Sequence, residues 1–437
     1  MITVLAYTMI VVFMAAIMFG YLSALIALIL VPSVFAVFAG FGAEIPPMMI
    51  EGIKSIAPTG VLLLFAILYF GLMIDLGLFN PIVRLVVRIC HGDPVRVIVG
   101  SAILSAVISL DGDGSTTYLL CVSAMLPLHR KLGINPLILP CVLMMPNSIM
   151  NVAPWGGPTA RVMAVMHLDA SQVFTPLIPS LALATLGAFA IAWFLGVSER
   201  KRLGRLTYDD RTGNVLGQTD DWVNPMESEI KVPVWRSVFN IVLTVGLMLL
   251  LILDAAPLAV LFMVAFAIAI TVNFPNVKDQ RDRIASHSSS VLAVVSVIFA
   301  AGVFTGILKG TGMTEALAQS IVWLIPEGHG NWLPLITAFV SAPFTFFLSN
   351  DAFYFGVVPV LAEAAKSYGI APEVIARASL IGQPIHQLSP LVAATYVLTG
   401  LSKVEFGDHQ KFSLKWAALL CLLMLIPALL TGAVTIW

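Results

Sequence analysis

Two stretches of this chain repeat each other at a constant distance. The sequence INPLILPCVLMMPNSIMNVAP (134–154) aligns without gaps with IAPEVIARASLIGQPIHQLSP (370–390). Further positions match at the same or nearly the same offset, namely Tyr118 with Tyr354 and Gly71 with Gly306. A repeat over this length predicts two structurally equivalent halves that contain the same elements in the same order.

The composition places both halves in a membrane. Hydrophobic residues make up 59% of the chain and charged residues only 11%, whereas soluble domains have about 25% charged residues. Apolar runs of roughly 17–25 residues match the thickness of a bilayer. No Lys or Arg precedes Lys54, so we expect no signal peptide. The chain is therefore predicted to be an all-α polytopic membrane protein.

One apolar run, 97–128, is interrupted by SLDGDGSTTY (109–118). A single very long helix and a hairpin are the two possible structures. The glycines and polar residues in the middle favour a hairpin, and each arm of about 22 Å is too short for a hydrocarbon core of ~30 Å. We therefore predict a re-entrant helical hairpin over 97–128. Its counterpart in the second half is 333–365, with the tip at FLSNDAFYFG (347–356).

Each half is also predicted to contain a transmembrane helix that is broken in the middle. The breaks lie at APWGGPT (153–159) and near GQPIHQLSP (382–390). The predicted organisation is a first repeat over 1–197 with its broken helix at 135–165, a cytoplasmic linker over 198–236, and a second repeat over 237–437 with its broken helix at 372–399.

The Lys and Arg residues indicate the sides of the membrane. With the linker in the cytoplasm, most of them lie inside and both termini lie outside. The exceptions are Lys54, Lys309 and Lys366 outside, and Arg161 and Arg377 within the membrane. The two repeats then have opposite orientations. Inverted repeats with broken helices are typical of secondary transporters, whose substrate binds between the repeats near the midplane.

Polar residues at the tips and breaks are the candidate site. A carboxylate at the bilayer centre costs several kcal/mol unless it faces a partner, water or an ion, so these residues are expected to converge. The expected substrate-binding residues are Ser115, Thr116, Asn147, Asn151, Gly156, Gly157, Thr159, Arg161, Ser349, Asn350, Gln383, His386, Gln387 and Ser389. The residues expected to carry protons or to approach a metal are Asp111, Asp113 and Asp351.

Their chemistry suits an anionic substrate that travels with a cation. Helix N-termini after Gly157 and Pro390 favour carboxylates, and Arg161 can bind a carboxylate with two parallel bonds. Oxygen ligands suit Mg²⁺, Ca²⁺, Mn²⁺ or Na⁺. Structural roles stay open for several residues: Asp113 can cap the second hairpin helix, and His386 can be a hydrogen-bonded core residue. Arg377 can pair with Glu363 or Glu373.

Other classes of protein are less compatible with the sequence. It contains no HExxH or GxSxG motif, so no enzyme is expected. An ion channel would show flux without saturation. No nucleic-acid partner and no resident cofactor are expected, because any metal would be part of the transported complex.

Five motifs resemble those of the citrate–metal–proton symporters, the CitMHS family of the ion-transporter superfamily: SLDGDGSTTY, NVAPWGGPTAR, LSNDAFYFGVVPVLAEAA, GQPIHQLSPLVAATYVLTGL and FGDHQKF. The resemblance covers nearly the whole chain. It implies import of citrate complexed with a divalent metal, in symport with protons, across a bacterial cytoplasmic membrane. A sodium-coupled or metal-free carrier of di- or tricarboxylates is the alternative.

The same resemblance implies a homodimer, an elevator mechanism, and hairpin tips with paired Ser-Asn motifs that hold carboxylates. Ser349 and Asn350 match this motif, whereas the first tip has Asp111 and Asp113 in its DGDG sequence. The two additional acids would fit a metal or proton site in place of a sodium site. The hairpins and broken helices are expected to move, with the first three spans and the last span of each repeat as the fixed scaffold.

Overall fold

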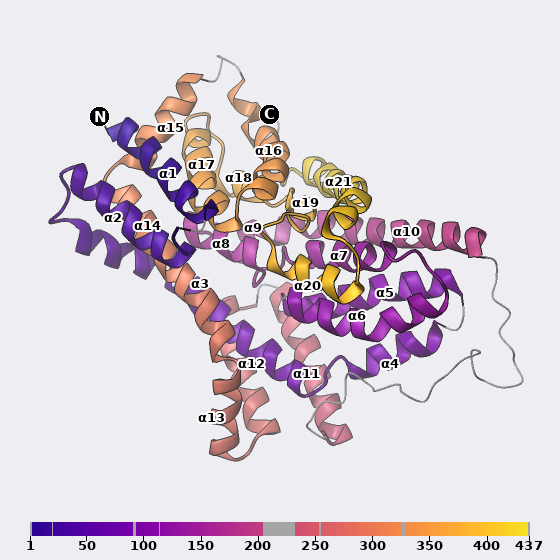
Figure 1. Ribbon diagram of the computed structural model, residues 1–437. Helices are drawn as coiled ribbons and strands as arrows, with labels where there is room; N and C mark the ends of the chain where they lie inside the picture. Colours follow the sequence, from indigo (N-terminus) through magenta and orange to yellow (C-terminus); the bar gives the residue numbers. More distant parts are fainter. Residues whose placement is uncertain are drawn as a thin grey trace, which may run out of the picture.

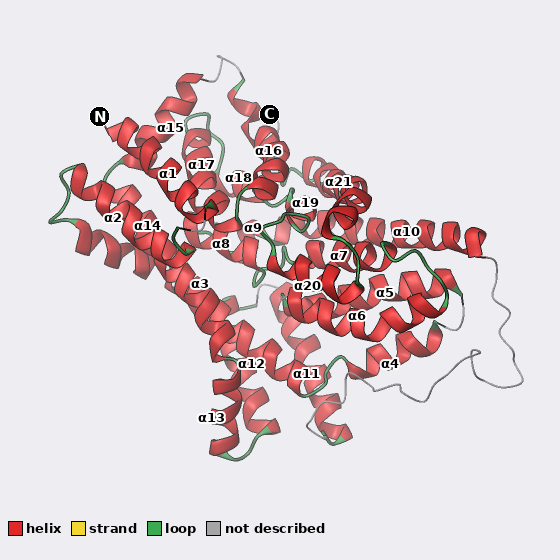
Figure 2. Cartoon of the chain, viewed as in Figure 1, coloured by secondary structure: helices red, strands yellow, loops and turns green. Residues whose placement is uncertain are grey.

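The structure is a computed structural model that describes residues 2–19, 21–90, 93–112, 114–203, 232–252, 255–324 and 329–435. These residues form helices joined by turns, with no strand among them (Figure 2). The all-α prediction is therefore confirmed. Most of the predicted linker lies outside the described residues. Four of the described helices are long and apolar enough to cross a membrane: Ile45–Asp75, Ala170–Leu203, Ser288–Gly310 and Phe406–Leu430.

The order of the helices is similar in the two halves (Figure 1). The first half contains α1 (Ile2–Met18), α2 (Ala24–Phe38), α3 (Ile45–Asp75), α4 (Asn80–Ile89), α5 (Pro94–Ile108), α6 (Gly114–Lys131), α7 (Ile138–Met150), α8 (Gly157–Met166), α9 (Ala170–Val173) and α10 (Ile178–Leu203). The second half contains α11 (Val234–Ile252), α12 (Leu258–Asn273), α13 (Val277–Ser286), α14 (Ser288–Gly310), α15 (Met313–Leu324), α16 (Leu333–Phe347), α17 (Val358–Lys366), α18 (Pro372–Ser379), α19 (Gln383–His386), α20 (Ala393–Ser402) and α21 (Phe406–Leu430).

The first hairpin consists of α5 and α6, which pack against each other. A short 3₁₀ segment, Ser109–Asp111, ends α5, and Gly112 then turns the chain with a φ of 79°. Left-handed backbone of this kind is accessible to glycine without steric cost, so the sequence makes its sharp turn here. The alternative of a single long helix over 97–128 is wrong.

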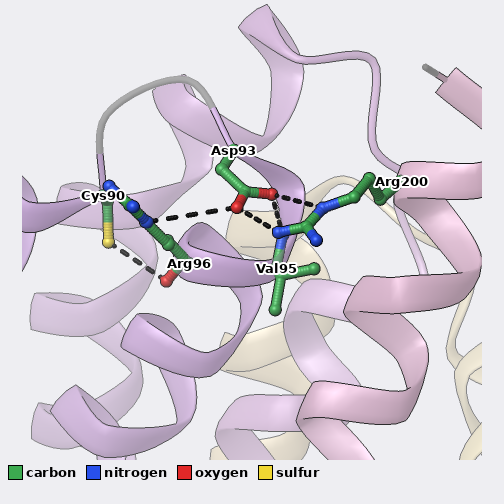
Figure 3. Close-up of polar contacts among 5 residues, drawn as sticks. All are labelled: Cys90, Asp93, Val95, Arg96 and Arg200. Atoms are coloured by element: carbon green, nitrogen blue, oxygen red, sulfur yellow. Dashed lines mark hydrogen bonds and ion pairs between the residues drawn. The ribbon is translucent and has the colours of Figure 1, made fainter. Parts of the chain in front are cut away.

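The base of the first hairpin is held by charge. Asp93 caps α5 by accepting from the N–H of Val95 at 3.1 Å, and Pro94 occupies the first helical position, where its missing N–H costs no bond. Figure 3 shows the carboxylate of Asp93 between the guanidinium groups of Arg200, from α10, and Arg96. Burial alone would raise the pKa of Asp93, but the hydrogen bonds and charges of these groups outweigh it and lower the pKa.

The second hairpin differs from the first in its returning arm. Its first arm is α16, and its second arm begins with a π-helical segment, Ala352–Val357, before α17. Ser349 precedes this segment, and its hydroxyl accepts from the N–H of Ala352 at 3.1 Å. π-helical turns are rare and frequently occur at functional sites. The predicted second hairpin is thus observed as two helical arms with an irregular tip.

Both predicted broken helices are interrupted near the expected places. The first ends with α7 at Met150 and resumes with α8 at Gly157, slightly before the predicted break. A Cβ at Gly156 would lie 2.0 Å from the carbonyl oxygen of Asn151, so the tight turn of the break requires glycine there. The second comprises α18 and α19, which ends at His386, and α20, which begins at Ala393.

The helices α3 and α14 lie side by side (Figure 1). Neighbouring pairs, in order along α3, are Met48 with Gly310, Gly52 with Gly306, Gly60 with Phe299, and Gly71 with His287. Since the order runs backward on α14, the two helices are antiparallel. A Cβ at Gly52 would lie 1.9 Å from the carbonyl oxygen of Gly302, so the backbones touch where glycines meet.

The last helices of the two halves, α10 and α21, form a second antiparallel pair. Gly187 lies against Leu423, and further along α10 the ring of Phe194 lies 5.9 Å from that of Trp416. α10 also packs against α5 and α7, and α21 packs against α19 and α7. These last spans were expected to join the first three spans in a scaffold, whereas in the structure they pack with the first hairpin and the broken helices. Periodicity alone could not reveal this, because both helices are apolar on most faces.

Candidate substrate site

A cavity of about 550 Å³ lies between the first hairpin tip, the first broken helix, and the pair α3 and α14. This "central cavity" is large enough for a small-molecule ligand. Its polar lining includes Ser115, Thr116, Arg161, His287 and Ser290. Four predicted substrate-binding residues, Ser115, Thr116, Gly157 and Arg161, are thus brought together on its wall.

The first tip is fixed to the first break by Trp155. Its indole Nε1 donates to the carbonyl oxygen of Leu110 at 2.9 Å, and its ring packs against those of Phe70 and Phe262. Gly112 turns against the same indole ring. Asp111 belongs to the 3₁₀ segment of this tip, and Asp113 lies outside the described residues. The bond from Trp155 therefore holds the tip against the cavity wall.

Arg161 joins the first broken helix to the second hairpin tip. Its Nε lies 2.6 Å from Oδ1 of Asp351, and its Nη1 donates to the carbonyl oxygen of Gly157, one turn earlier in α8, at 2.9 Å. The two side chains are 21% and 17% exposed, so the pair is largely shielded, and Arg161 lines the cavity. Nη2 has no partner among the described residues and is available to an anion.

Two tyrosines hold buried amide side chains at equivalent positions of the repeat. Tyr118 donates to Oδ1 of Asn147 at 2.9 Å, and Nδ2 of that amide donates to Ser109 at 3.0 Å. In the second half, Nε2 of Gln383 donates to the hydroxyl of Tyr354 at 2.7 Å and approaches Oδ1 of Asn350 at 3.5 Å. Both contacts connect the returning arm of a hairpin to the first part of a broken helix. Asn147, Gln383 and Asn350 therefore position the tips.

His386 and Ser389 bind backbone and do not line the central cavity. His386 donates from Nδ1 to the carbonyl oxygen of Thr345 at 2.6 Å, and Ser389 donates to that of Phe346 at 2.7 Å. These carbonyls belong to the last turn of α16, where helical partners are missing. The two residues thus cap α16 and hold the second tip. For His386, the structural interpretation fits this geometry.

The remaining predicted residues lie close to the breaks. Thr159 donates to the carbonyl oxygen of Val152 at 2.8 Å, which closes the first break. Asn151 begins this break and is half-buried. The side-chain oxygens of Gln383 and Gln387 are buried without a partner among the described residues.

Arg377 does not form the ion pair considered for it with Glu363 or Glu373. Its Nη1 donates instead to the carbonyl oxygen of Ala433 at 2.9 Å.

Sequence reasoning missed Trp155, Tyr118 and Tyr354 as residues that position the site, and His287 as a residue on the far wall of the cavity. The match of Tyr118 with Tyr354 in the repeat was a usable signal for the two tyrosines. His287 gave no such signal, because its connection with the cavity depends on the packing of α14 against α3. No cluster of three or more His, Cys, Asp or Glu side chains suited to a metal occurs in the described part of the chain.

The arrangement can bind a small anion between a fixed cation and hydroxyl donors. Arg161 supplies charge, Ser115 and Thr116 supply hydroxyl groups, and the N-terminus of α8 lies beside them at Gly157. Backbone N–H groups at a helix N-terminus and a guanidinium group favour carboxylates. Asp351 is then a competing carboxylate that occupies part of Arg161.

Comparison with known proteins identifies similar sequences. The sequence model of the CitMHS family, described as "Citrate transporter", matches residues 1–382. A "Citrate transporter" of Bacillus subtilis (strain 168) is 53% identical over 435 residues, covering 100% of both chains. The "Mg(2+)/citrate complex secondary transporter" of the same organism is 48% identical over 440 residues, also covering 100% of both.

Two solved structures share the fold at low sequence identity. The Alcanivorax borkumensis YdaH transporter superposes with a TM-score of 0.57 at 16% identity, covering 90% of this chain and 89% of its own. Neisseria gonorrhoeae MtrF, described with a class of antimetabolite efflux pumps, superposes with a TM-score of 0.58 at 15% identity, covering 88% and 83%. At this identity the likeness concerns the fold alone.

Proposed function

The chain belongs to the CitMHS family of citrate transporters, and from this premise we propose that it imports citrate as a complex with a divalent metal ion, in symport with protons. Family membership and the apolar helices make it a multi-pass membrane protein for secondary citrate transport and not an enzyme. The resemblance drawn from the five motifs is thereby confirmed. The metal complex, the protons and the residue roles are the proposal.

The ion pair between Arg161 and Asp351 is the observation that carries the proposal. Arg161 lines the central cavity, and its pair with Asp351 joins the first broken helix to the second hairpin tip. A carboxylate of citrate that binds Arg161 must displace Asp351 or share the guanidinium with it. Protonation of Asp351 removes this competition, so binding of a proton and binding of citrate favour each other. This is the thermodynamic requirement for symport through one site.

The charge of the cargo favours proton coupling. Citrate³⁻ with a divalent metal is a monoanion, and a negative-inside membrane opposes its entry by about 2.3 kcal/mol per 100 mV. Two or more protons that enter with the complex reverse the sign of the transported charge. The relative named for the Mg(2+)/citrate complex supports the metal-bound form of the cargo.

We assign the carboxylates of citrate to Arg161, Ser115, Thr116 and the N-terminus of α8. Asn147, Asn350 and Gln383 would hold the tips around them. The metal would face Asp111 and Asp113 of the first tip, since oxygen ligands suit hard divalent cations. The transported metal and citrate are both substrate, so the protein needs no resident cofactor.

We propose that the two halves are inverted repeats. The antiparallel pairs α3 with α14 and α10 with α21 support this, because equivalent elements of inverted repeats run in opposite directions. An elevator movement would carry the hairpins and broken helices, now with α10 and α21, past α3 and α14. The Lys and Arg distribution supports a cytoplasmic linker, with both termini outside, in a bacterial cytoplasmic membrane. A homodimer is part of the same proposal.

Uptake of labelled citrate into proteoliposomes tests the function. We expect uptake to require Mg²⁺ or another divalent metal, to stop with EDTA, and to increase with an inward proton gradient. Uptake that is unchanged by EDTA would exclude the metal complex, and stimulation by Na⁺ in place of protons would indicate the sodium-coupled alternative. Asp113→Asn should abolish transport while expression is retained. Near-normal transport by this variant would refute the coupling role of Asp113.

A further inference from the structure

We propose that His287 accepts the coupled proton from the central cavity and passes it to the cytoplasm. This inference rests on the proposed proton symport and on the proposed orientation of the chain. His287 precedes α14, at the end of the α3 and α14 pair where α3 carries Asp75 and the neighbouring α13 carries Arg283. Its side chain lines the same cavity as Arg161.

The imidazole of His287 is oriented by the carboxylate of Asp75. Its Nε2 lies 2.9 Å from Oδ2 of Asp75, and Nη1 of Arg283 lies 3.6 Å from the same oxygen. Since an ionised carboxylate only accepts hydrogen bonds, Nε2 carries a hydrogen, and in the neutral imidazole Nδ1 has the lone pair. Nδ1 has no hydrogen-bond partner among the described residues. The carboxylate stabilises the imidazolium that forms when Nδ1 takes a proton, as in other Asp–His pairs.

Helix packing does not require this polar pair. At the offset that matches Gly71 with Gly306, the position of His287 corresponds to Gly52 and that of Asp75 to Gly310. At the other end of the two helices, the close approach is therefore made by glycines, with no ionisable side chain in these positions. Of these four matched positions, only the two at the end that meets the central cavity carry His and Asp, so a role beyond packing explains them best.

The charged groups around His287 define the proton step. Asp75 of α3 faces Nε2, Arg283 of α13 holds Asp75, and Arg161 of α8 lies on the same cavity wall. A proton leaves the carrying acid of the transport site through water in the cavity and bonds to Nδ1. The imidazolium then gives this proton to cytoplasmic water and becomes neutral. The acid is left as a carboxylate, ready for the empty carrier to return.

Measuring two transport modes, net uptake and exchange, distinguishes an effect on proton release from an effect on citrate binding. Net uptake requires the proton to leave on the inside, whereas exchange of labelled for unlabelled citrate–Mg²⁺ at equal pH requires no deprotonation. We expect His287→Gln to slow net uptake at least tenfold, since positioned acid–base groups contribute typically 10²–10⁴ to a proton transfer. Exchange should stay within about twofold of the wild type. Asp75→Asn should act in the same direction.

The matched control is His167→Gln. His167 lines a separate cavity of about 200 Å³ with Lys309 and Lys366, so this substitution should leave both modes unchanged. Wild-type net uptake by His287→Gln would overturn the inference. Equal loss of net uptake and exchange would also overturn it, because His287 would then serve folding or citrate binding. Uptake by the wild type without response to a pH gradient would instead refute proton symport itself.

Discussion

The two hairpin tips meet the candidate site in different ways. The first tip forms part of the wall of the central cavity through Gly112, Ser115 and Thr116. The second tip lines no part of that wall and reaches it only through Asp351, which pairs with Arg161. The two tips therefore differ in their position relative to the cavity, although the halves that contain them match in sequence. In the proposed function, the first tip would contact the substrate, and the second would supply a carboxylate that competes with the substrate for Arg161.

The amide side chains that contact the two tips also differ, in how many of their polar atoms have hydrogen-bond partners. Asn147, behind the first tip, has partners for both its oxygen and its nitrogen. Gln383, behind the second tip, has partners only for its nitrogen, and its buried oxygen has none among the described residues. Because an unpaired buried polar atom costs about 1–3 kcal/mol, the second tip is held less firmly. The proposed release of Arg161 by the second tip would be easier with this weaker anchorage.

Removal of Arg161 should have the largest effect. Arg161→Gln removes the only guanidinium on the described wall of the central cavity, so a charge-assisted contact of about 3 kcal/mol is lost. We expect citrate–Mg²⁺ uptake to fall roughly 100-fold. Arg161→Lys keeps the charge but not the planar fork and should recover only part of the activity. Uptake at the wild-type rate by Arg161→Gln would show that both tips serve some other site.

Asp351→Asn tests whether the second tip competes with the substrate. The neutral amide should release Arg161, so binding of citrate–Mg²⁺ measured by calorimetry should become about tenfold tighter, equivalent to about 1.4 kcal/mol. Net uptake driven by a pH gradient should fall by a similar factor, because the proton-sensitive competitor is gone. Weaker binding by this variant would contradict the competition and would make Asp351 a direct ligand of the substrate.

The two tyrosines allow the anchorage of the tips to be compared directly. Tyr354→Phe deprives Gln383 of its 2.7 Å partner and leaves only the 3.5 Å approach to Asn350. Tyr118→Phe deprives Asn147 of one partner, while Ser109 remains. In detergent, we expect Tyr354→Phe to reduce stability by about 1–3 kcal/mol and Tyr118→Phe by about 1 kcal/mol. Equal losses in thermal unfolding assays would remove the proposed difference between the tips.

The base of the first hairpin should show the smallest effect. Asp93→Ala removes both the cap of α5 and the pair with Arg200, and should cost about 1 kcal/mol. Asp93→Asn retains a capping acceptor and should cost less. Because the pKa of Asp93 is lowered from 3.8, its ionised form stabilises the fold above that value and the contribution disappears as the pH falls further. The difference between wild type and Asp93→Ala should therefore be constant above about pH 5 and decrease below it.

Local elements were predictable from the sequence because they depend on local chemistry. The glycines of SLDGDGSTTY allow the turn at Gly112, and APWGGPT lacks the residues that continue a helix, so both the hairpin and the break follow from the printed residues. The gathering of Ser115, Thr116, Gly157 and Arg161 also followed, because tips and breaks had to share their polar groups. These arguments need no knowledge of which helices are neighbours.

Partners between distant segments were not predictable in this way. Arg161 was expected to bind substrate and Asp351 to carry protons or approach the metal, but nothing in either segment indicated that they pair. The backbone contacts of His386 and Ser389 depend on where α16 ends relative to α19. The position of α10 and α21 beside the first hairpin and the broken helices depends on which apolar faces meet, and apolar faces of similar composition do not specify a partner.

The glycine contact between α3 and α14 has a mechanical consequence. Where Gly52 meets Gly302 and Gly306, main chain touches main chain, so no side chain is present that could change rotamer and let one helix slip along the other. These helices form one boundary of the central cavity, and in the proposed elevator movement they would be the fixed part. If the opposite boundary moves as proposed, its displacement would change the width of the cavity directly, because the rigid helix pair would not move with it.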